Sequence, residues 1–261
     1  MQFSVRYILL FSIAVCGVCA IFVSSLAVGL KERQEVNEIL FKQRNVLEAA
    51  GLVTSDEQVT NERIEELFAS VEPVLVDLAT GEEMVFGDEA AAFDQQKAKK
   101  DPAISIEVER NPSNVRRVPN QAQVFKLMGA DGQLEKLILP IEGYGLWGTL
   151  YGFIALEADT RTIAGITYYD HKETPGLGGE VDNPRWKGLW PGRLAFDDAG
   201  SIEIEVVKGN VGPATEEPYK VDGLAGATIT SRGVTNMLHF WLGENGFGPY
   251  LDNLRQGKGA V

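Results

Sequence analysis

The pattern of apolar and polar positions sets the start of the chain apart from the rest. No charged side chain occurs from Tyr7 to Leu30, a run of 24 residues, which would span about 36 Å as a helix. A bilayer core is about 30 Å thick. A cleaved signal peptide is the alternative, because Arg6 supplies a basic start and residues 25–27 a small-residue cleavage site, but the apolar part of a signal peptide usually has about 7–15 residues. We therefore expect a retained single-pass anchor over residues 1–30.

Helical spacing continues after the apolar run. Apolar residues recur at near-helical intervals over residues 31–50, with Gly51 as the expected C-cap. Thr60 or Asn61 is placed to cap a further helical turn. Residues 88–101 are polar and rich in Ala and Lys, which predicts a connector or an exposed helix. We expect residues 31–100 to form a mainly helical region next to the membrane.

The remainder of the chain is dominated by short apolar runs typical of strands. Residues 101–261 are expected to form a separate domain, in which several strands precede one clear helix, Val234 to Leu242. That order predicts an α+β fold with an antiparallel, twisted sheet. The expected strands, including one before the domain, are Val74 to Leu78, Ile104 to Val108, Val124 to Leu127, Leu137 to Leu139, Leu150 to Leu156, Ile163 to Tyr168 and Ile202 to Val207.

Charge and composition exclude several classes of function. The net charge is −13 and the pI is near 4.7, whereas nucleic-acid binding requires basic patches. The sequence has no Walker A motif, no dinucleotide-binding glycine fingerprint and no cluster of zinc ligands. We therefore expect no nucleic-acid partner and no nicotinamide site in this chain.

Both cysteines, Cys16 and Cys19, lie in the apolar segment. Their C-x-x-C spacing is compatible with a metal or redox site, and in a redox membrane complex such thiolates could serve an iron–sulfur centre. Cysteines on a spanning helix are more often packing residues. We favour packing and expect no metal site.

The stretch from Asp222 to Thr228, Asp-Gly-Leu-Ala-Gly-Ala-Thr, is a run of small residues that ends in a hydroxyl. Gly226 and Ala227 would allow a large group to approach the backbone. A helix start nearby would offer unpaired N–H groups to a phosphate. The competing interpretation is an ordinary helix entry with Thr230 or Ser231 as N-cap.

Three segments of the sequence resemble a known family. Residues 222–228 resemble the flavinylation signature Asp-x-x-[Ser/Thr]-Gly-Ala-Thr, with Ala225 in place of the hydroxyl residue. Residues 143–157 and 171–180, together with the apolar start, are similar to the FMN-carrying C subunit of Na+-translocating NADH:quinone oxidoreductases. The resemblance covers the anchor and nearly all of the second half, and is looser over residues 31–100.

The resemblance implies FMN joined by a phosphoester to Thr228, with Thr230 as the nearest rival acceptor. Asp222 would be recognised by the flavin-attaching transferase. The phosphate would lie beside Gly226 and Ala227.

Two other segments are candidates to hold the flavin ring. Thr174, Gly176, Leu177 and Gly178 form a glycine-rich loop that could bring a hydroxyl, an apolar side chain and backbone N–H groups to the ring. Without the resemblance, this loop would be a surface turn. Tyr144 and Trp147 could shield the ring by stacking, or they could be packing residues beside the sheet.

The implied function is that of an electron carrier with no acid–base catalytic residues of its own. Its partners would be the other subunits of the oxidoreductase complex, the transferase and the lipid bilayer. The resemblance also implies a bacterial inner-membrane location with the soluble domain outside the cytoplasm; the charges beside the anchor do not decide its orientation. The alternatives are the flavoprotein subunit of the related ion-translocating ferredoxin:NAD+ oxidoreductase and a non-redox, membrane-anchored binding protein.

Overall fold

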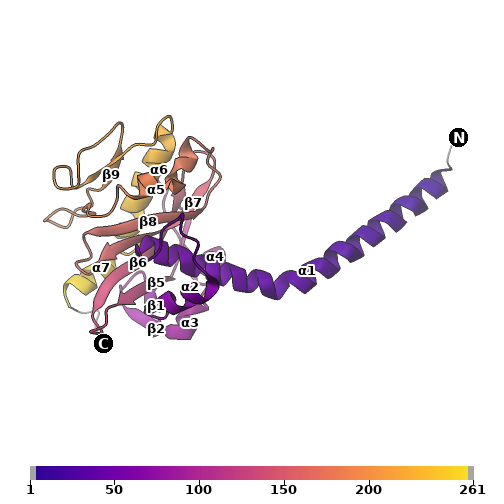
Figure 1. The fold of residues 1–261 in the computed structure, drawn as a ribbon, viewed down its shortest axis with the longest axis horizontal. Helices are drawn as coiled ribbons and strands as arrows, with labels where there is room; N and C mark the ends of the chain where they lie inside the picture. The colour runs from indigo at the N-terminus through magenta and orange to yellow at the C-terminus, as the bar shows by residue number, and fades with distance from the viewer. Residues whose placement is uncertain (1–3, 258–261) are drawn as a thin grey trace. The chain divides into compact units, whose positions relative to one another are not determined.

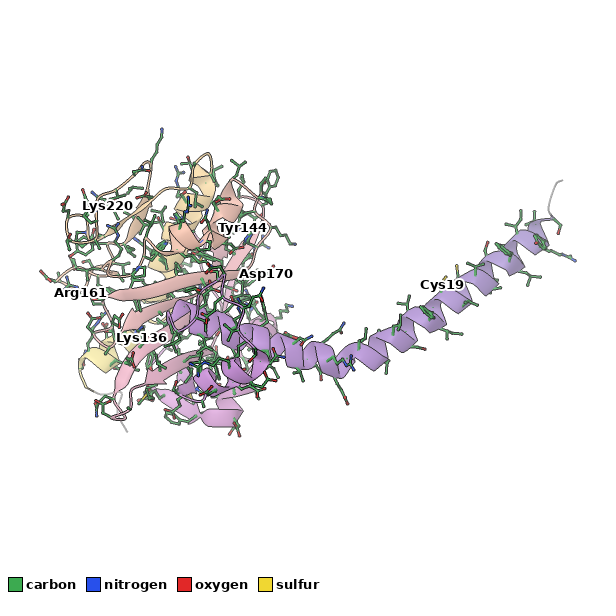
Figure 2. All side chains as sticks on the ribbon, in the orientation of Figure 1. Cys19, Lys136, Tyr144, Arg161, Asp170 and Lys220 are labelled. Atoms are coloured by element: carbon green, nitrogen blue, oxygen red, sulfur yellow. The ribbon has the colours of Figure 1, made fainter. Side chains whose placement is uncertain are left out.

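A computed structural model describes residues 4–257, and contacts between residues divide the chain into two units, residues 1–42 and 43–261. Helix α1 (Val5–Ala49) belongs to both. Within the described residues it is the one helix long and apolar enough to cross a membrane. Figure 2 labels Cys19 on this apolar part of the helix. The helix expected over the apolar segment and over residues 31–50 is thus present as one continuous element.

A six-stranded antiparallel sheet forms the centre of the second unit (Figure 1). Its strand order is β2-β1-β5-β6-β7-β8. Together with the helices described below, this sheet confirms the expected α+β class. The strands are β1 (Val71–Asp77), β2 (Glu83–Phe86), β5 (Gln121–Met128), β6 (Leu134–Tyr144), β7 (Thr149–Glu157) and β8 (Ile163–Asp170).

Helices cover both faces of this sheet, as the alternating side chains of β6 show. Successive side chains of a strand point to opposite faces. On one face, α6 (Thr228–Leu242) approaches β6 so closely that a Cβ added to Gly143 would lie 2.6 Å from the Cβ of Met237. On the other face, Lys136 donates to the carbonyl of Ala50, just after α1, and Glu142 pairs with Lys99 of α4 (Gln95–Lys100).

The end of α1 is fixed to the domain by a partly buried ion pair. Glu48 pairs with Lys187 of α5 (Pro184–Lys187), and its carboxylate also accepts a hydrogen bond from Ser55 at 2.5 Å. The backbone of Ala49 packs against Gly165 in β8. Residues 43–49 therefore belong to the soluble domain, although they continue the helix that starts in the apolar segment.

Shorter elements complete the domain. The side chain of Thr60 caps the first of them by accepting from the backbone N–H of Arg63, as expected. The polar stretch over residues 88–101 contains two short helices. The remaining elements are α2 (Asn61–Phe68), α3 (Gly87–Ala91), β3 (Ser105–Glu107), β4 (Arg117–Pro119), η1 (Gly178–Asp182), β9 (Glu205–Val207), β10 (Lys220–Asp222) and α7 (Gly248–Arg255).

The unit boundaries and the start of α6 differ from the sequence-based expectation. The unit boundary lies after residue 42, whereas the sequence suggested boundaries after 30 and 100, because β1 and β2 join the same sheet as β5. Helix α6 begins at Thr228 instead of Val234. This earlier start places Thr228, the candidate flavin acceptor, in the first turn of the helix.

Candidate functional site

Three segments that are far apart in the sequence meet beside the start of α6. They are the β6–β7 connection (residues 144–148), the loop after β8 (residues 171–180) and the turn that leads into α6 (residues 223–228). Tyr144, labelled in Figure 2, ends β6 in the part of the domain that holds α5 and α6 in Figure 1. The candidate residues Tyr144, Trp147, Leu177 and Thr228 are distributed over these three segments.

Thr228 is the first residue of α6 and is exposed. The N-cap is the buried Ala227, and no side chain caps the helix, so the expected N-caps Thr230 and Ser231 are wrong. Gly226 precedes them with φ of 72°, a left-handed conformation that favours glycine. The turn therefore leaves the Thr228 hydroxyl open to solvent at a helix end whose first N–H groups lack a side-chain partner.

Thr230, the rival acceptor, has a different environment. Its side chain is fully buried, and its Oγ1 donates to the carboxylate of Glu173 at 2.5 Å. A hydroxyl held in this way is shielded from an attaching enzyme. Exposure thus separates the two threonines although only one residue lies between them.

Asp222 ends β10 and is engaged in the local structure. Its carboxylate accepts from the backbone N–H of Val211 at 2.8 Å. Its carbonyl accepts from the indole of Trp186 at 2.8 Å. Asp222 therefore holds two neighbouring segments in place, and its half-buried side chain does not belong to the exposed surface around Thr228.

The loop after β8 is organised by a tight turn. The carbonyl of Thr174 accepts from the backbone N–H groups of Leu177 and Gly179, at 3.1 and 2.9 Å. Gly176 has φ of 77°, which permits the turn. The turn presents Leu177 with 44% of its surface exposed, while Gly178 is buried beneath it.

Close backbone contacts join the candidate residues. A Cβ added to Gly226 would lie 3.0 Å from Cδ2 of Leu177, so the turn before α6 touches the loop after β8. A Cβ on Gly233 would lie 2.5 Å from the carbonyl oxygen of Tyr144, so α6 touches the β6–β7 connection. The same segments and the first turn of α6 carry exposed apolar side chains: Tyr144, Leu146, Trp147, Leu177 and Ile229.

Glu173 joins the β6–β7 connection and the loop after β8 to the first turn of α6, and the sequence indicated no role for it within its loop. Only 5% of its surface is exposed. One carboxylate oxygen accepts from the backbone N–H groups of Leu146 and Trp147, both at 2.9 Å, and the other accepts from Thr230. An acidic residue just before a glycine-rich turn is the only sign of this role in the sequence.

Two side chains behind the site have buried or hydrogen-bonded polar groups. Burial, and then the charge of Asp182, raise the pKa of Tyr168 above its ordinary value, so its phenol stays neutral. His171 accepts from the backbone N–H of Glu173 at its Nδ1. Its Nε2 forms a hydrogen bond with the carboxylate of Asp182 at 2.7 Å. Both contacts brace the loop after β8.

The cysteines lie outside this site. Cys16 and Cys19 are free and exposed on α1. Among residues 4–257, no group of three or more His, Cys, Asp or Glu side chains is arranged to hold a metal ion.

Comparisons with known proteins relate this site to flavin binding. A family model described as the FMN-binding domain matches residues 145–243, which include most of the three segments. The C subunit of the Na(+)-translocating NADH-quinone reductase of Yersinia pestis is 45% identical over 97% of this chain and 94% of its own length. The protein of the same name from Pseudomonas aeruginosa is 44% identical over 98% of each chain.

Solved structures agree with these matches. The crystal structure of NqrC from Shewanella oneidensis superimposes with a TM-score of 0.76 and 35% identity, covering 86% of this chain and 99% of that one. The C subunit of the Na(+)-translocating NADH-quinone reductase of Parabacteroides distasonis gives a TM-score of 0.65 and 31% identity, covering 85% and 96%.

Proposed function

The chain belongs to the NqrC family, the C subunits of Na(+)-translocating NADH-quinone reductases, and we propose that it relays electrons through an FMN joined covalently to Thr228. It is part of an oxidoreductase complex, with other subunits as partners, and its cofactor is FMN. This membership favours the C subunit of the quinone reductase over two alternatives. They are the flavoprotein subunit of the ferredoxin:NAD+ oxidoreductase and a non-redox binding protein. The observation that carries the proposal is the exposed Thr228 at the uncapped start of α6.

The residues of the site fit an FMN. Its phosphate needs hydrogen-bond donors, and the start of a 15-residue helix without a side-chain cap offers backbone N–H groups and the positive end of the dipole. Its isoalloxazine ring needs apolar surface. Trp147 and Leu177 are 62% and 44% exposed. Exposure of apolar surface to water is unfavourable, and a bound ring would cover these side chains.

Each residue then has a defined role. The Oγ1 of Thr228 would lose its proton and bond to the phosphorus of an activated flavin phosphate brought by the attaching transferase, while the bond from that phosphorus to its activating group would break and that group would leave with the electron pair. Leu177 and Trp147 would exclude water from the ring, and Tyr144 would extend this apolar surface. The turn at Gly176 would present the backbone and the hydroxyl of Thr174. A fixed attachment keeps donor and acceptor positions constant in every turnover.

Bound FMN supplies reversible electron uptake. The sequence offers no nicotinamide site, so electrons from NADH would reach this chain through partner subunits. NADH added to the isolated, flavin-loaded chain should therefore leave its visible spectrum unchanged. In the assembled complex, NADH should bleach the same absorption. Bleaching of the isolated chain by NADH would contradict the relay.

We propose that the flavin-attaching transferase recognises Asp222. Two substitutions test this role. Asp222→Asn removes the charge but keeps an oxygen that can accept from the Val211 N–H. We expect this variant to lose most of its flavin occupancy while its Tm stays near that of wild type. Asp222→Ala also removes the hydrogen bond, so both occupancy and Tm should fall, the latter by the equivalent of about 1 kcal/mol.

Flavin fluorescence in a denaturing gel, measured beside Tm on the same preparations, checks this prediction. Full occupancy in both variants would leave Asp222 with a structural role only.

The apolar part of α1 and membership in a membrane complex indicate a membrane anchor. We propose that the anchor is retained at the bacterial inner membrane and that the domain lies outside the cytoplasm, where a covalent bond prevents loss of FMN. The intact chain should then resist carbonate extraction from membranes, because transfer of the 24 uncharged residues 7–30 into water is costly. Recovery of a soluble form that begins near Val28 would instead indicate a cleaved signal peptide.

A further inference from the structure

A buried carboxylate lies beneath the proposed flavin site. Glu173 accepts three hydrogen bonds, from the backbone of Leu146 and Trp147 and from the hydroxyl of Thr230. Among residues 4–257, no ion pair involves Glu173. All three of its donors are thus neutral groups.

Small residues enclose this carboxylate. A Cβ on Gly145 would lie 2.6 Å from its Oε1. A Cβ on Gly178 would lie 2.6 Å from Oγ1 of Thr230, the donor to Oε2. Water is therefore largely excluded from the carboxylate. Because the local dielectric constant is low, its negative charge is weakly screened.

The three donors belong to the segments that carry the exposed residues of the site. Trp147 is itself a donor through its backbone N–H. Leu177 follows Glu173 in the same loop. Thr230 lies two residues after Thr228, in the first turn of α6. Loss of the carboxylate would release these contacts together and leave the backbone N–H groups of residues 146 and 147 without this acceptor.

We propose that Glu173 is a positioning residue that holds the three segments in register and whose fixed negative charge lowers the reduction potential of the flavin. This inference rests on the proposed function, because it requires FMN at Thr228. The charge acts by opposing the addition of electrons to a group held by the neighbouring residues. The hydrogen bonds act by fixing the backbone of residues 146–147 and the first turn of α6.

Two variants of the full chain separate these effects. Glu173→Gln keeps the shape and an acceptor oxygen but removes the charge, so covalent flavin and Tm should be retained while the midpoint potential rises. Glu244→Gln removes the same charge from an exposed position just after α6, where solvent screens it, and should leave the potential at the wild-type value. An unchanged potential in Glu173→Gln would overturn the electrostatic role.

Glu173→Ala tests the positioning role without flavin. In protein produced without the transferase, amide hydrogen exchange at Leu146 and Trp147 should become roughly tenfold faster or more, because both N–H groups lose their acceptor. Unchanged exchange at these two amides would overturn the positioning role. The proposed function fails separately, if wild type made with the transferase carries no covalent flavin.

Discussion

Thr228→Val is expected to give a folded protein that carries no covalent flavin. Valine has the shape of threonine but lacks the hydroxyl, and the exposed position of Thr228 means that little packing changes. The Tm of the flavin-free domain should therefore stay within the equivalent of about 0.5 kcal/mol of wild type. Fluorescence in a denaturing gel and the intact mass of the chain, made together with the transferase, measure the loss.

Thr230→Val is the matched control for this experiment. It removes a buried hydroxyl and its hydrogen bond to Glu173, so its stability should fall by about 1–3 kcal/mol. The variant should nevertheless keep covalent flavin, because Thr228 is intact. Flavin lost from Thr230→Val and kept by Thr228→Val would move the attachment site to Thr230.

Gly233→Ala should destabilise the domain and lower its flavin content, although alanine is the better helix former by about 1 kcal/mol. The added Cβ would lie 2.5 Å from the carbonyl oxygen of Tyr144 and 3.2 Å from the Cα of Gly145. These are backbone atoms, so relief requires α6 to move away from the β6–β7 connection. We expect a net loss of about 1–3 kcal/mol.

The neighbouring Arg232→Ala provides the control for this variant. Arg232 is exposed on the same turn of α6, so its replacement raises helix propensity without a steric conflict. Thermal unfolding and flavin occupancy of both variants give the comparison. Wild-type Tm and full occupancy in Gly233→Ala would show that the close approach of α6 to Tyr144 is not needed for the site.

The strands could be predicted from the sequence where their apolar runs are long. β7 and β8 lie close to their expected limits because both are buried over most of their length. β2 was missed, since it is a four-residue edge strand with alternately exposed side chains. In a short edge strand, few residues show the alternation of apolar and polar side chains. The pairing of β2 with β1 depends on contacts across the sheet.

The start of α6 shows why local signals were insufficient. The segment from Thr228 to Gly233 is rich in Thr, Ser and Gly, which are poor helix formers or common caps. In the structure, Ser231 donates to the carbonyl of Ala227 and accepts from the N–H of Leu224. Thr230 donates to Glu173. These contacts stabilise a helical turn that propensity alone does not predict.

The candidate site residues come in part from the resemblance and in part from the structure. The resemblance supplied the residues that the structure brings together, including Leu177 against Gly226. The resemblance did not indicate the contacts of Glu173, because its hydrogen-bond partners are 26, 27 and 57 residues away in the sequence. Only the pairing of β6 with β7 and the packing of α6 on β6 bring these partners around it.

Every role proposed for the site residues requires FMN on Thr228. Cleavage of the wild-type full chain after Lys220 and Arg232 releases residues 221–232, which contain both candidate threonines. Fragment masses of this peptide, from protein made together with the transferase, show which residue carries the flavin. We predict the added mass of the flavin phosphate on Thr228 and none on Thr230. An unmodified peptide, or flavin located on any other residue, would contradict attachment at Thr228.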